Sequence, residues 1–198
     1  MSCYVVGISG ASGAIYGVTL LEYLLRERYQ VYLILSPSAR LIIREELGRE
    51  WGQCFSETLV ALKREYSNDQ LIYCDEADMC APVASGSVPT EGMVVAPCSM
   101  KTLAGIAHGF SSNLIGRAAD VTLKEKRPLV LIPRETPLHH VHLKNMLAVS
   151  EMGAALLPAM PGFYHHPKTI DDLVRFVVAR ALDLIGVKNT LSTRWNAL

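Results

Sequence analysis

Residues 4–17 read YVVGISGASGAIYG and join a short apolar run to the beginning of a helical pattern. The run at residues 4–8 has the length and apolar character of a strand that is buried on both faces. From Ala14 onward, apolar residues recur with helical spacing. A strand, a tight turn and a helix in this order predict a β-α-β arrangement, and therefore a parallel sheet.

The same alternation of strand and helix patterns continues along the chain. We expect strands at residues 4–8, 31–35, 71–74, 93–96, 129–132 and 155–157, and helices at residues 14–27, 38–47, 56–66, 99–108, 113–126, 142–152 and 170–185. Because no repeat or linker interrupts this pattern, we predict a single α/β domain over residues 1–198, with a mostly parallel sheet covered by helices on both faces. The longest loop, residues 75–91, is of the length that is usually functional or mobile.

The composition narrows the classes of function. The 198 residues include 19 Lys and Arg against 19 Asp and Glu, and half are apolar. This balance argues against a disordered chain and against a nucleic-acid binder, which needs a surplus of basic residues. No apolar run reaches about 18 residues, so we expect no membrane span.

The five cysteines predict a reducing compartment. They are odd in number and form no CxxC pair: Cys3, Cys54, Cys74, Cys80 and Cys98. We therefore expect free thiols and a cytoplasmic protein. The amino-terminal residues lack the basic and apolar regions of a signal peptide, which agrees with that expectation.

Small and polar residues follow the expected strands. They form the segments 9–13, 36–38, 97–102, 133–135 and 158–164. Because the carboxyl ends of parallel strands meet at one edge of the sheet, we expect a ligand site there.

Two of these segments favour an anion. Residues 7–13 have the spacing GxxGxxG at a helix start, which differs from the dinucleotide motif GxGxxG and lacks the lysine of a phosphate-binding Walker loop. Residues 98–102, CSMKT, begin a second helix with Ser99 and Thr102. Each segment alone could be an ordinary tight turn or helix cap, but two such helix starts at one edge suit a phosphate.

Four charged residues lie on rows of otherwise apolar helical positions: Glu46, Arg117, Lys124 and Arg180. An inward-facing charge needs an ion pair or a ligand, so these residues are either structural pairs, such as Lys124 with Asp120, or parts of a site. With Arg134, the three basic residues could form a phosphate or carboxylate pocket. The histidines at 139, 140, 142, 165 and 166 lack good metal-ligand spacing, so we predict no metal and assign them to solvent or to an interface.

A series of motifs over nearly the whole chain resembles the UbiX/Pad family of flavin prenyltransferases. The motifs are GISGASGAIYG (7–17), SPSARLIIREE (36–46), ASGS (84–87), PCSMKTLAGIA (97–107), NLIGRAADVTLKEKRPLVLIPRE (113–135), HLKNML (142–147) and MPGFYHHP (160–167). The resemblance implies a flavodoxin-like Rossmann three-layer sandwich that assembles as a homododecamer with FMN at subunit junctions. It also implies that the carboxyl-terminal helix and tail, from about residue 170, contribute to the site and to subunit contacts.

The resemblance further implies a reaction. The family transfers a dimethylallyl group from dimethylallyl monophosphate to reduced FMN, first to the central-ring nitrogen and then by a second carbon–carbon bond that closes a fourth ring. Prenylated FMN is the product and serves UbiD-type decarboxylases. No metal is required.

Matching the motifs residue by residue gives an expected site. FMN would contact Gly10, Ala11, Ser12, Ser36, Ser99, Met100, Lys101, Thr102 and Arg134. The dimethylallyl phosphate would contact Arg117, Lys124, Tyr164 and Arg180, and the catalytic residues would be Ser12, Glu46, Glu135 and Lys124. Some members carry an aromatic residue just before the ASGS segment, where this chain has Met79 and Cys80.

Two other functions are compatible with the same motifs. One is a flavin-dependent decarboxylase that acts directly on an aromatic or cysteinyl acid, although the histidine and the asparagine-rich motif of the related cysteine decarboxylases are not found here. The other is a non-enzymatic FMN carrier subunit for a decarboxylase.

Overall fold

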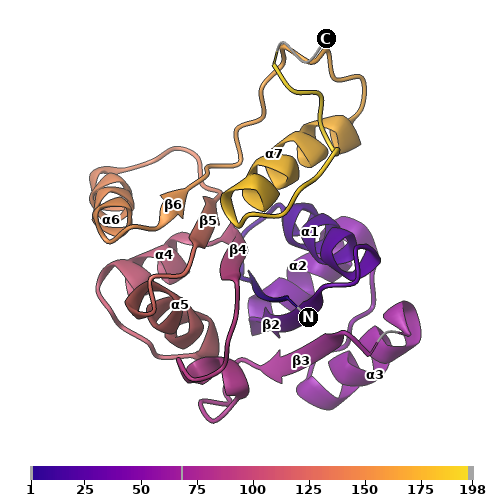
Figure 1. Cartoon of the computed structure of the whole chain (residues 1–198), viewed down its shortest axis with the longest axis vertical. Helices are drawn as coiled ribbons and strands as arrows, with labels where there is room; N and C mark the ends of the chain where they lie inside the picture. Colours follow the sequence, from indigo (N-terminus) through magenta and orange to yellow (C-terminus); the bar gives the residue numbers. More distant parts are fainter. Residues whose placement is uncertain (1, 68, 196–198) are drawn as a thin grey trace.

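The computed structural model describes residues 2–67 and 69–195, which form one six-stranded parallel sheet (Figure 1). The strands are β1 (Cys3–Ile8), β2 (Gln30–Leu35), β3 (Leu71–Asp75), β4 (Gly92–Cys98), β5 (Leu129–Pro133) and β6 (Ala155–Leu156). Their order in the sheet is β3-β2-β1-β4-β5-β6, and every neighbouring pair is parallel. The prediction of a parallel sheet is confirmed.

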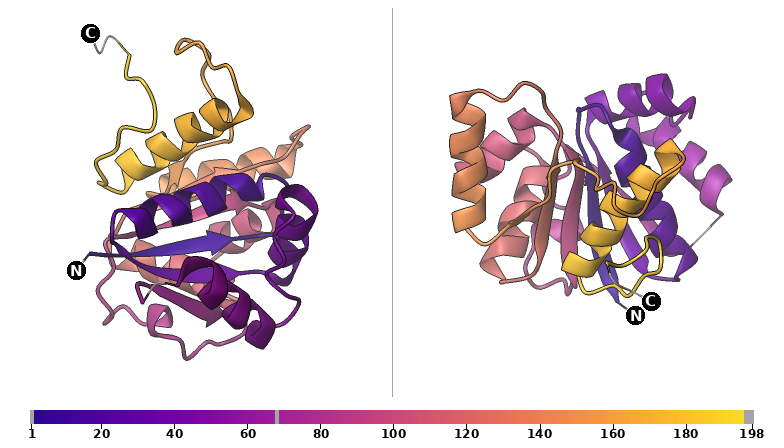
Figure 2. Two further views of the ribbon diagram at one scale, coloured as in Figure 1. Left: turned by 90° about the vertical axis from the view of Figure 1, so that its right-hand side faces the viewer. Right: turned by 90° about the horizontal axis from the view of Figure 1, so that it is seen from above.

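Helices cover both faces of the sheet, as the edge-on view in Figure 2 shows. They are α1 (Ala14–Arg26), α2 (Pro37–Leu47), α3 (Phe55–Tyr66), α4 (Met100–Ala107), α5 (Leu114–Lys124), α6 (His140–Glu151) and α7 (Ile170–Leu184). Buried residues of α1, α2, α3 and α7 pack in one apolar cluster, and those of α4, α5 and α6 pack in another across the sheet. The flavodoxin-like three-layer sandwich is therefore confirmed.

Each expected strand and helix is present, and the differences at their ends have local causes. Helix α6 begins two residues earlier than the apolar pattern indicated because the ring of His139 accepts a hydrogen bond from the backbone N–H of Val141 and caps the helix. Helix α5 ends at Lys124, two residues earlier than expected, and Lys126 then has a positive φ of 56°. The long loop between β3 and β4 contains a short 3-10 helix, Pro82–Ala84.

The order of the strands creates a position for a ligand at the carboxyl ends of β1 and β4. From β1 the chain proceeds outward to β2 and β3, and it then returns to the other side of β1 as β4. Connections on the two sides of β1 therefore diverge at the carboxyl ends of β1 and β4, which is the usual binding position in such sheets. Helix α1 lies directly against this region, since a Cβ at Gly17 would be 2.0 Å from the carbonyl oxygen of Ala96.

The carboxyl-terminal part of the chain lies at one side of this core. Helix α7 packs against α1. In Figures 1 and 2, the connection from β6 to α7 and the segment after α7 extend together beyond the sheet. Among the described residues, no helix has the length and apolar character needed to cross a membrane.

Candidate functional site

Ser9 joins the ends of the two central strands. It is 1% exposed, its Oγ donates a hydrogen bond to the carbonyl of Pro97 at 2.8 Å, and the same oxygen accepts one from the N–H of Ser99 at 2.8 Å. The loop after β1 and the start of α4 are therefore held as one unit. Sequence reasoning did not assign Ser9 a role, although a serine at the end of a buried strand was a signal that it forms such a link.

A cavity of about 350 Å³ opens beside this link. Its lining consists of Gly10, Ser36, Pro37, Ser38, Glu76, Ser99, Lys101, Thr102, Gly105, Phe110, Ser112, Asn113 and Gly116. Five of the nine residues expected at FMN are thus brought together: Gly10, Ser36, Ser99, Lys101 and Thr102. A Cβ at Gly10 would lie 2.5 Å from the Cβ of Ser38, so glycine is what allows the first loop to approach α2 so closely.

Three helices begin at this cavity. Ser36 caps α2 by accepting a hydrogen bond from Ala39 N–H, Ser99 caps α4 through Thr102 N–H, and Asn113 caps α5 through Gly116 N–H. The amino end of a helix carries a partial positive charge and free N–H groups, which together favour an anion. Lys101 adds a full positive charge, so the cavity suits a phosphate.

Glu76 is the acidic residue of this cavity, and sequence reasoning did not identify it. Its carboxylate accepts a hydrogen bond of 2.7 Å from the side-chain amide of Asn113. Burial raises the pKa of Glu76, while the positive charge of Lys101 opposes this rise. The sequence signal was limited to its place at the start of the long loop 75–91.

The start of α1 departs from expectation. The carboxylate of Glu46 accepts hydrogen bonds from Gly13 N–H at 2.9 Å and from Ala14 N–H at 3.0 Å. The anion at this helix start is therefore the chain's own carboxylate, and the expectation that the glycine-rich loop offers these groups to a ligand is wrong. Local sequence spacing could not predict this cap, because Glu46 is 33 residues away from Gly13 in the chain.

Several expected site residues surround this capped loop. Arg134 Nε donates a hydrogen bond of 3.0 Å to the carbonyl oxygen of Ser12, so Ser12, Arg134 and Glu46 lie together. Glu135, next in the chain after Arg134, is exposed and accepts a hydrogen bond from Thr136 N–H. Ala11 is buried and Met100 half-buried, and neither lines the cavity described above.

A second, smaller cavity of about 150 Å³ lies at α7 and the carboxyl-terminal segment. It is lined by Tyr164, Phe176, Ala179, Arg180, Ser192, Thr193, Arg194 and Trp195. Two of the four residues expected at the dimethylallyl phosphate, Tyr164 and Arg180, therefore share a cavity. The ring of Trp195 meets that of Tyr164 edge to face, with 5.0 Å between centroids.

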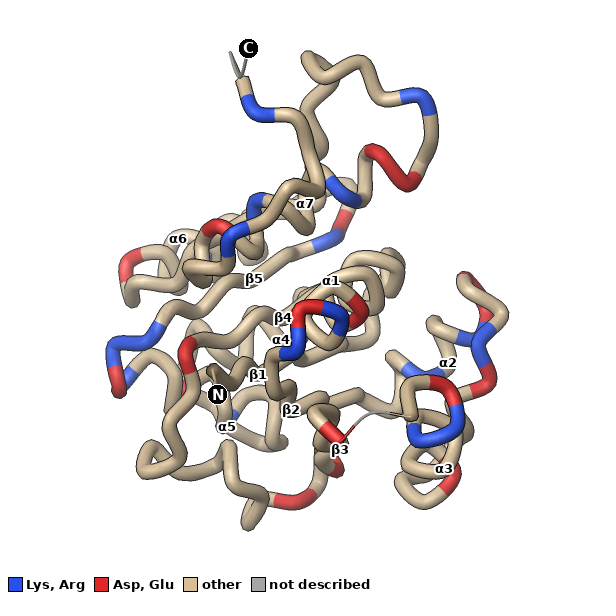
Figure 3. Tube along the Cα trace, turned by 45° about the vertical axis from the view of Figure 1, so that its right-hand side comes forward, with Lys and Arg blue, Asp and Glu red and all other residues tan. Residues whose placement is uncertain are grey.

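The expected inward-facing charges are not inward-facing. Glu46, Lys124 and Arg180 are exposed, and Arg117 is half-buried. The suggested pair between Lys124 and Asp120 is also wrong, because Asp120 pairs with Arg117 at 2.9 Å while Lys124 pairs with Glu125 at 3.4 Å. Long side chains reach solvent from an apolar row by extending past it, which helical periodicity does not reveal. Charges of both signs are spread over many helices and loops (Figure 3).

The basic residues also do not converge within one chain. Helix α5 begins at the larger cavity, but its 11 residues place Lys124 about 15 Å farther along the axis, at the opposite end. Arg117 donates to the carbonyl of Ala84 and pairs with Asp120, whereas Arg180 lines the smaller cavity. A single pocket made by Arg117, Lys124, Arg134 and Arg180 of one chain is therefore not observed.

Cysteine and histidine side chains do not add a metal centre to this region. Cys98 is fully buried, and burial raises the pKa of its thiol to about 12, as expected for a packing residue. All five cysteines are free. Across residues 2–67 and 69–195, no group of three or more His, Cys, Asp or Glu side chains could hold a metal ion.

This chain is similar to known flavoproteins over most of its length. The model of the Flavoprotein family matches residues 2–182. The flavin prenyltransferase UbiX of Alkalihalophilus pseudofirmus is 53% identical over 193 residues, which are 96% of this chain and 94% of that protein.

Two solved structures have the same fold over nearly their whole length. A dodecameric FMN-dependent UbiX-like decarboxylase from Escherichia coli O157:H7 is 44% identical, with a TM-score of 0.85 over 98% of this chain and 100% of the other. AnUbiX (PadA1), in complex with FMN and dimethylallyl pyrophosphate, is 41% identical, with a TM-score of 0.86 over 100% and 98% of the two chains. The chain belongs to the flavoprotein family and, within it, to the UbiX flavin prenyltransferases.

Proposed function

We propose that this protein is a flavin prenyltransferase that transfers a dimethylallyl group from dimethylallyl monophosphate to reduced FMN and releases prenylated FMN. The observation that carries the proposal is the cavity at which α2, α4 and α5 all begin, beside the cluster of Ser12, Glu46 and Arg134. The name of the 53% identical relative and the two ligands of the AnUbiX structure support it.

The larger cavity fits FMN by its donors. The amino ends of three helices and Lys101 would bind the phosphate, and the hydroxyls of Ser36, Ser99 and Thr102 would bind the phosphate or the sugar chain. Arg134 is hydrogen-bonded to the loop that contains Gly10, Ala11 and Ser12, and it would lie beside the flavin ring. Met100, at the start of α4, would also contact the flavin ring. Reduced FMN supplies the electron-rich ring that accepts the dimethylallyl group.

The dimethylallyl phosphate would occupy the smaller cavity, where Tyr164 and Arg180 bind its phosphate. Arg117 and Lys124 lie on α5, away from this cavity, so we infer that a second copy of the chain contributes them. The dodecameric state of the Escherichia coli relative supports such an assembly. Three exposed apolar residues of α6 offer a surface for it: Val141, Leu143 and Leu147.

The charged residues have separate chemical tasks in this proposal. Arg117, Lys124 and Arg180 stabilise the negative charge that grows on the phosphate as the carbon–oxygen bond breaks. Glu46 and Glu135 transfer protons, and Ser12 orients the phosphate or the transferred proton next to Glu46. The four basic residues of the proposed site, Arg117, Lys124, Arg134 and Arg180, carry more positive charge than Glu46 and Glu135 carry negative charge. This surplus of positive charge suits two phosphorylated ligands.

Three further assignments belong to this proposal. The structure of AnUbiX contains the diphosphate, and we propose the monophosphate as the donor here. The product would be received by a UbiD-type decarboxylase. The five free cysteines support a cytoplasmic location, and we propose a single domain over residues 1–198 whose part after residue 170 contacts substrate and neighbouring subunits.

The test is anaerobic incubation of the protein with reduced FMN and dimethylallyl monophosphate, followed by mass spectrometry of the flavin. We expect a flavin heavier by one isoprenyl unit, and the diphosphate in a parallel reaction should give less product. Arg180→Ala and Tyr164→Phe should weaken use of the phosphate while leaving the Kd for FMN unchanged, because FMN occupies the other cavity. An unchanged flavin mass under verified reduction would refute the proposal.

A second function receives support from the name of one relative. The 44% identical structure from Escherichia coli is described as an FMN-dependent decarboxylase, so direct decarboxylation of an aromatic acid by this chain is the alternative. Turnover of such an acid by the purified protein with FMN alone would favour it. A carrier subunit, in contrast, would bind flavin and form no covalent product under any condition.

A further inference from the structure

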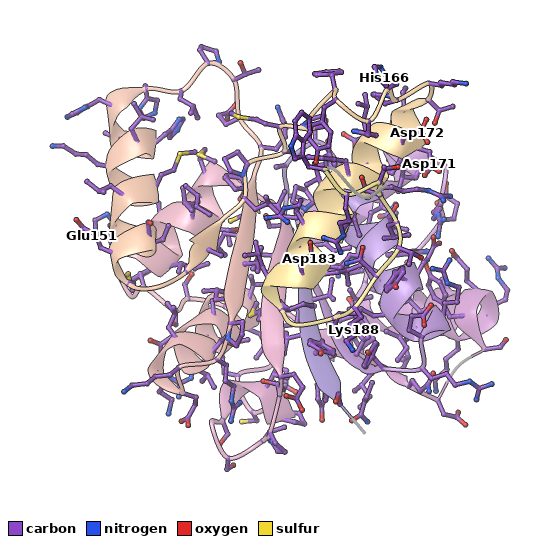
Figure 4. The ribbon with its side chains drawn as sticks, turned by 45° about the horizontal axis from the view of Figure 1, so that its top comes forward. Glu151, His166, Asp171, Asp172, Asp183 and Lys188 are labelled. Carbon is purple, nitrogen blue, oxygen red and sulfur yellow. The ribbon has the colours of Figure 1, made fainter. Side chains whose placement is uncertain are left out.

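Asp183 is an acidic residue near the end of α7 that the roles above do not use (Figure 4). Its side chain is only 22% exposed, and both carboxylate oxygens accept hydrogen bonds. Oδ2 accepts from Arg180 at 3.2 Å and from Arg194, and Oδ1 accepts from Arg194 at 2.7 Å and from Asn189 at 3.0 Å. These four hydrogen bonds fill the acceptor positions of one carboxylate.

The contact with Arg180 uses one donor of its guanidinium group. Within residues 2–67 and 69–195, Asp183 is the only hydrogen-bond partner of the Arg180 side chain, through Nη1. Nε and Nη2 therefore keep their N–H donors for another acceptor. Because a guanidinium group is planar, fixing one nitrogen limits the directions in which the others point. Asp183 thus restricts a side chain that is otherwise 52% exposed and long enough to adopt many conformations.

The contact with Arg194 connects the same carboxylate to a second arginine that lines the smaller cavity. Arg194 binds both oxygens of Asp183, and its neighbour Trp195 meets the ring of Tyr164. Hydrogen bonds from Arg194 are the first cause that lowers the pKa of Asp183, so the carboxylate is charged at neutral pH. One side chain therefore orients Arg180 and also attaches the carboxyl-terminal segment that lines the cavity.

We propose that Asp183 is a positioning residue for binding of the dimethylallyl phosphate: it orients Arg180 and holds the segment 192–195 against Tyr164. The inference rests on the proposed function of this cavity. Asp183 is not among the residues that line the cavity. Its negative charge, taken alone, would weaken binding of an anion, so the favourable effect that we propose is orientation of Arg180 and not charge.

The direction in which the KM changes in Asp183→Asn distinguishes orientation of Arg180 from the effect of charge. Asp183→Asn removes one charge and presents an amide N–H₂ to two guanidinium groups, so Arg180 and Arg194 lose their fixed positions. If orientation dominates, the KM for dimethylallyl monophosphate rises about tenfold, because the arginine must be ordered when the ligand binds. If charge dominates, the KM falls. Asp183→Glu keeps the charge and the acceptors and should restore the KM to within about threefold of the native value.

Asp171→Asn is the matched control. Asp171 lies at the other end of the same helix (Figure 4) and forms an ion pair of 2.6 Å with Arg175, and neither residue lines the cavity. The control should change neither the KM nor the Kd for FMN. All variants are assayed as FMN-containing, assembled protein, with thermal unfolding recorded for each.

A second readout does not depend on turnover. Calorimetric titration of dimethylallyl monophosphate into protein that contains oxidised FMN measures binding directly. The inference requires weaker binding by Asp183→Asn, at an unchanged Kd for FMN, and recovery in Asp183→Glu. An unchanged or stronger affinity, or an equal loss in Asp171→Asn, overturns it. Failure of the native protein to prenylate FMN would instead refute the proposed function, whatever the result of the titration.

Discussion

Replacement of Glu46 by alanine should loosen the start of α1 as well as reduce activity. In the structure its carboxylate accepts hydrogen bonds from Gly13 and Ala14 N–H, and it places a negative charge at the amino end of the helix. Loss of a helix cap costs about 0.5–2 kcal/mol and loss of a favourable charge there about 0.3–1 kcal/mol. Because Glu46 is exposed, we expect the lower part of the summed range, about 1–2 kcal/mol.

Hydrogen exchange of the assembled protein can measure this local effect. A loss of about 1–2 kcal/mol corresponds to an increase of about 5- to 30-fold in the exchange rate of amides in residues 13–17. Glu46→Gln keeps one oxygen acceptor but loses the charge, so about half of the loss should remain. Product formation should fall in both variants, since Gln cannot transfer the proton.

Glu45→Ala is the control for this experiment. Glu45 lies next to Glu46 on α2 and forms an exposed ion pair with Arg44. Such a pair typically contributes well under about 1 kcal/mol to the free energy of unfolding. Its removal should leave exchange in residues 13–17 unchanged. If Glu46→Ala and Glu45→Ala show the same exchange rates there, Glu46 does not cap α1 in solution and the reasoning is refuted.

Three further results are expected. Lys101→Ala should raise the Kd for FMN about five- to tenfold in a fluorescence titration, because it removes a cation from the phosphate cavity, whereas Lys63→Ala should not. Gly17→Ala should lower the free energy of unfolding by about 2–3 kcal/mol in urea, since its Cβ would collide with the carbonyl of Ala96; equal stability would contradict the packing described. Hydrogen bonds from Ser56 lower the pKa of Cys54, so iodoacetamide should label Cys54 at neutral pH, and the labelling rate should increase as the pH rises. Burial raises the pKa of Cys98 to about 12, so labelling of Cys98 in the intact protein would contradict its burial.

The fold could be predicted because local signals and packing agree. Strands such as β1 are apolar at nearly every position, as a strand between two helical layers must be, and Ser36, Ser99 and Asn113 cap helices where the hydrophobic pattern begins. The start of α6 was predicted two residues too late because the helix is capped by the ring of His139, which is an uncommon cap.

The site was less predictable because it depends on contacts between distant segments. The edge of the sheet and the serines of the larger cavity followed from the order of strands and helices. Glu46, however, is 33 residues from the N–H of Gly13 that it binds, and Glu76 is 37 residues from Asn113. No helical or strand period relates such positions. The exposure of Arg180 and Lys124 depends on where long side chains extend, which an apolar row does not determine.

The length of α5 has a genetic consequence if the assembly is as proposed. A subunit with a defective Lys124 would impair the site of its neighbour, whereas a subunit with a defective Arg180 would impair its own. Two alleles, one inactive at each position, could then share a cell and still form some intact sites, about a quarter of them under random mixing. Two alleles that are both inactive at Arg180 could not. Such complementation between alleles distinguishes a site shared by two subunits from one contained in a single chain.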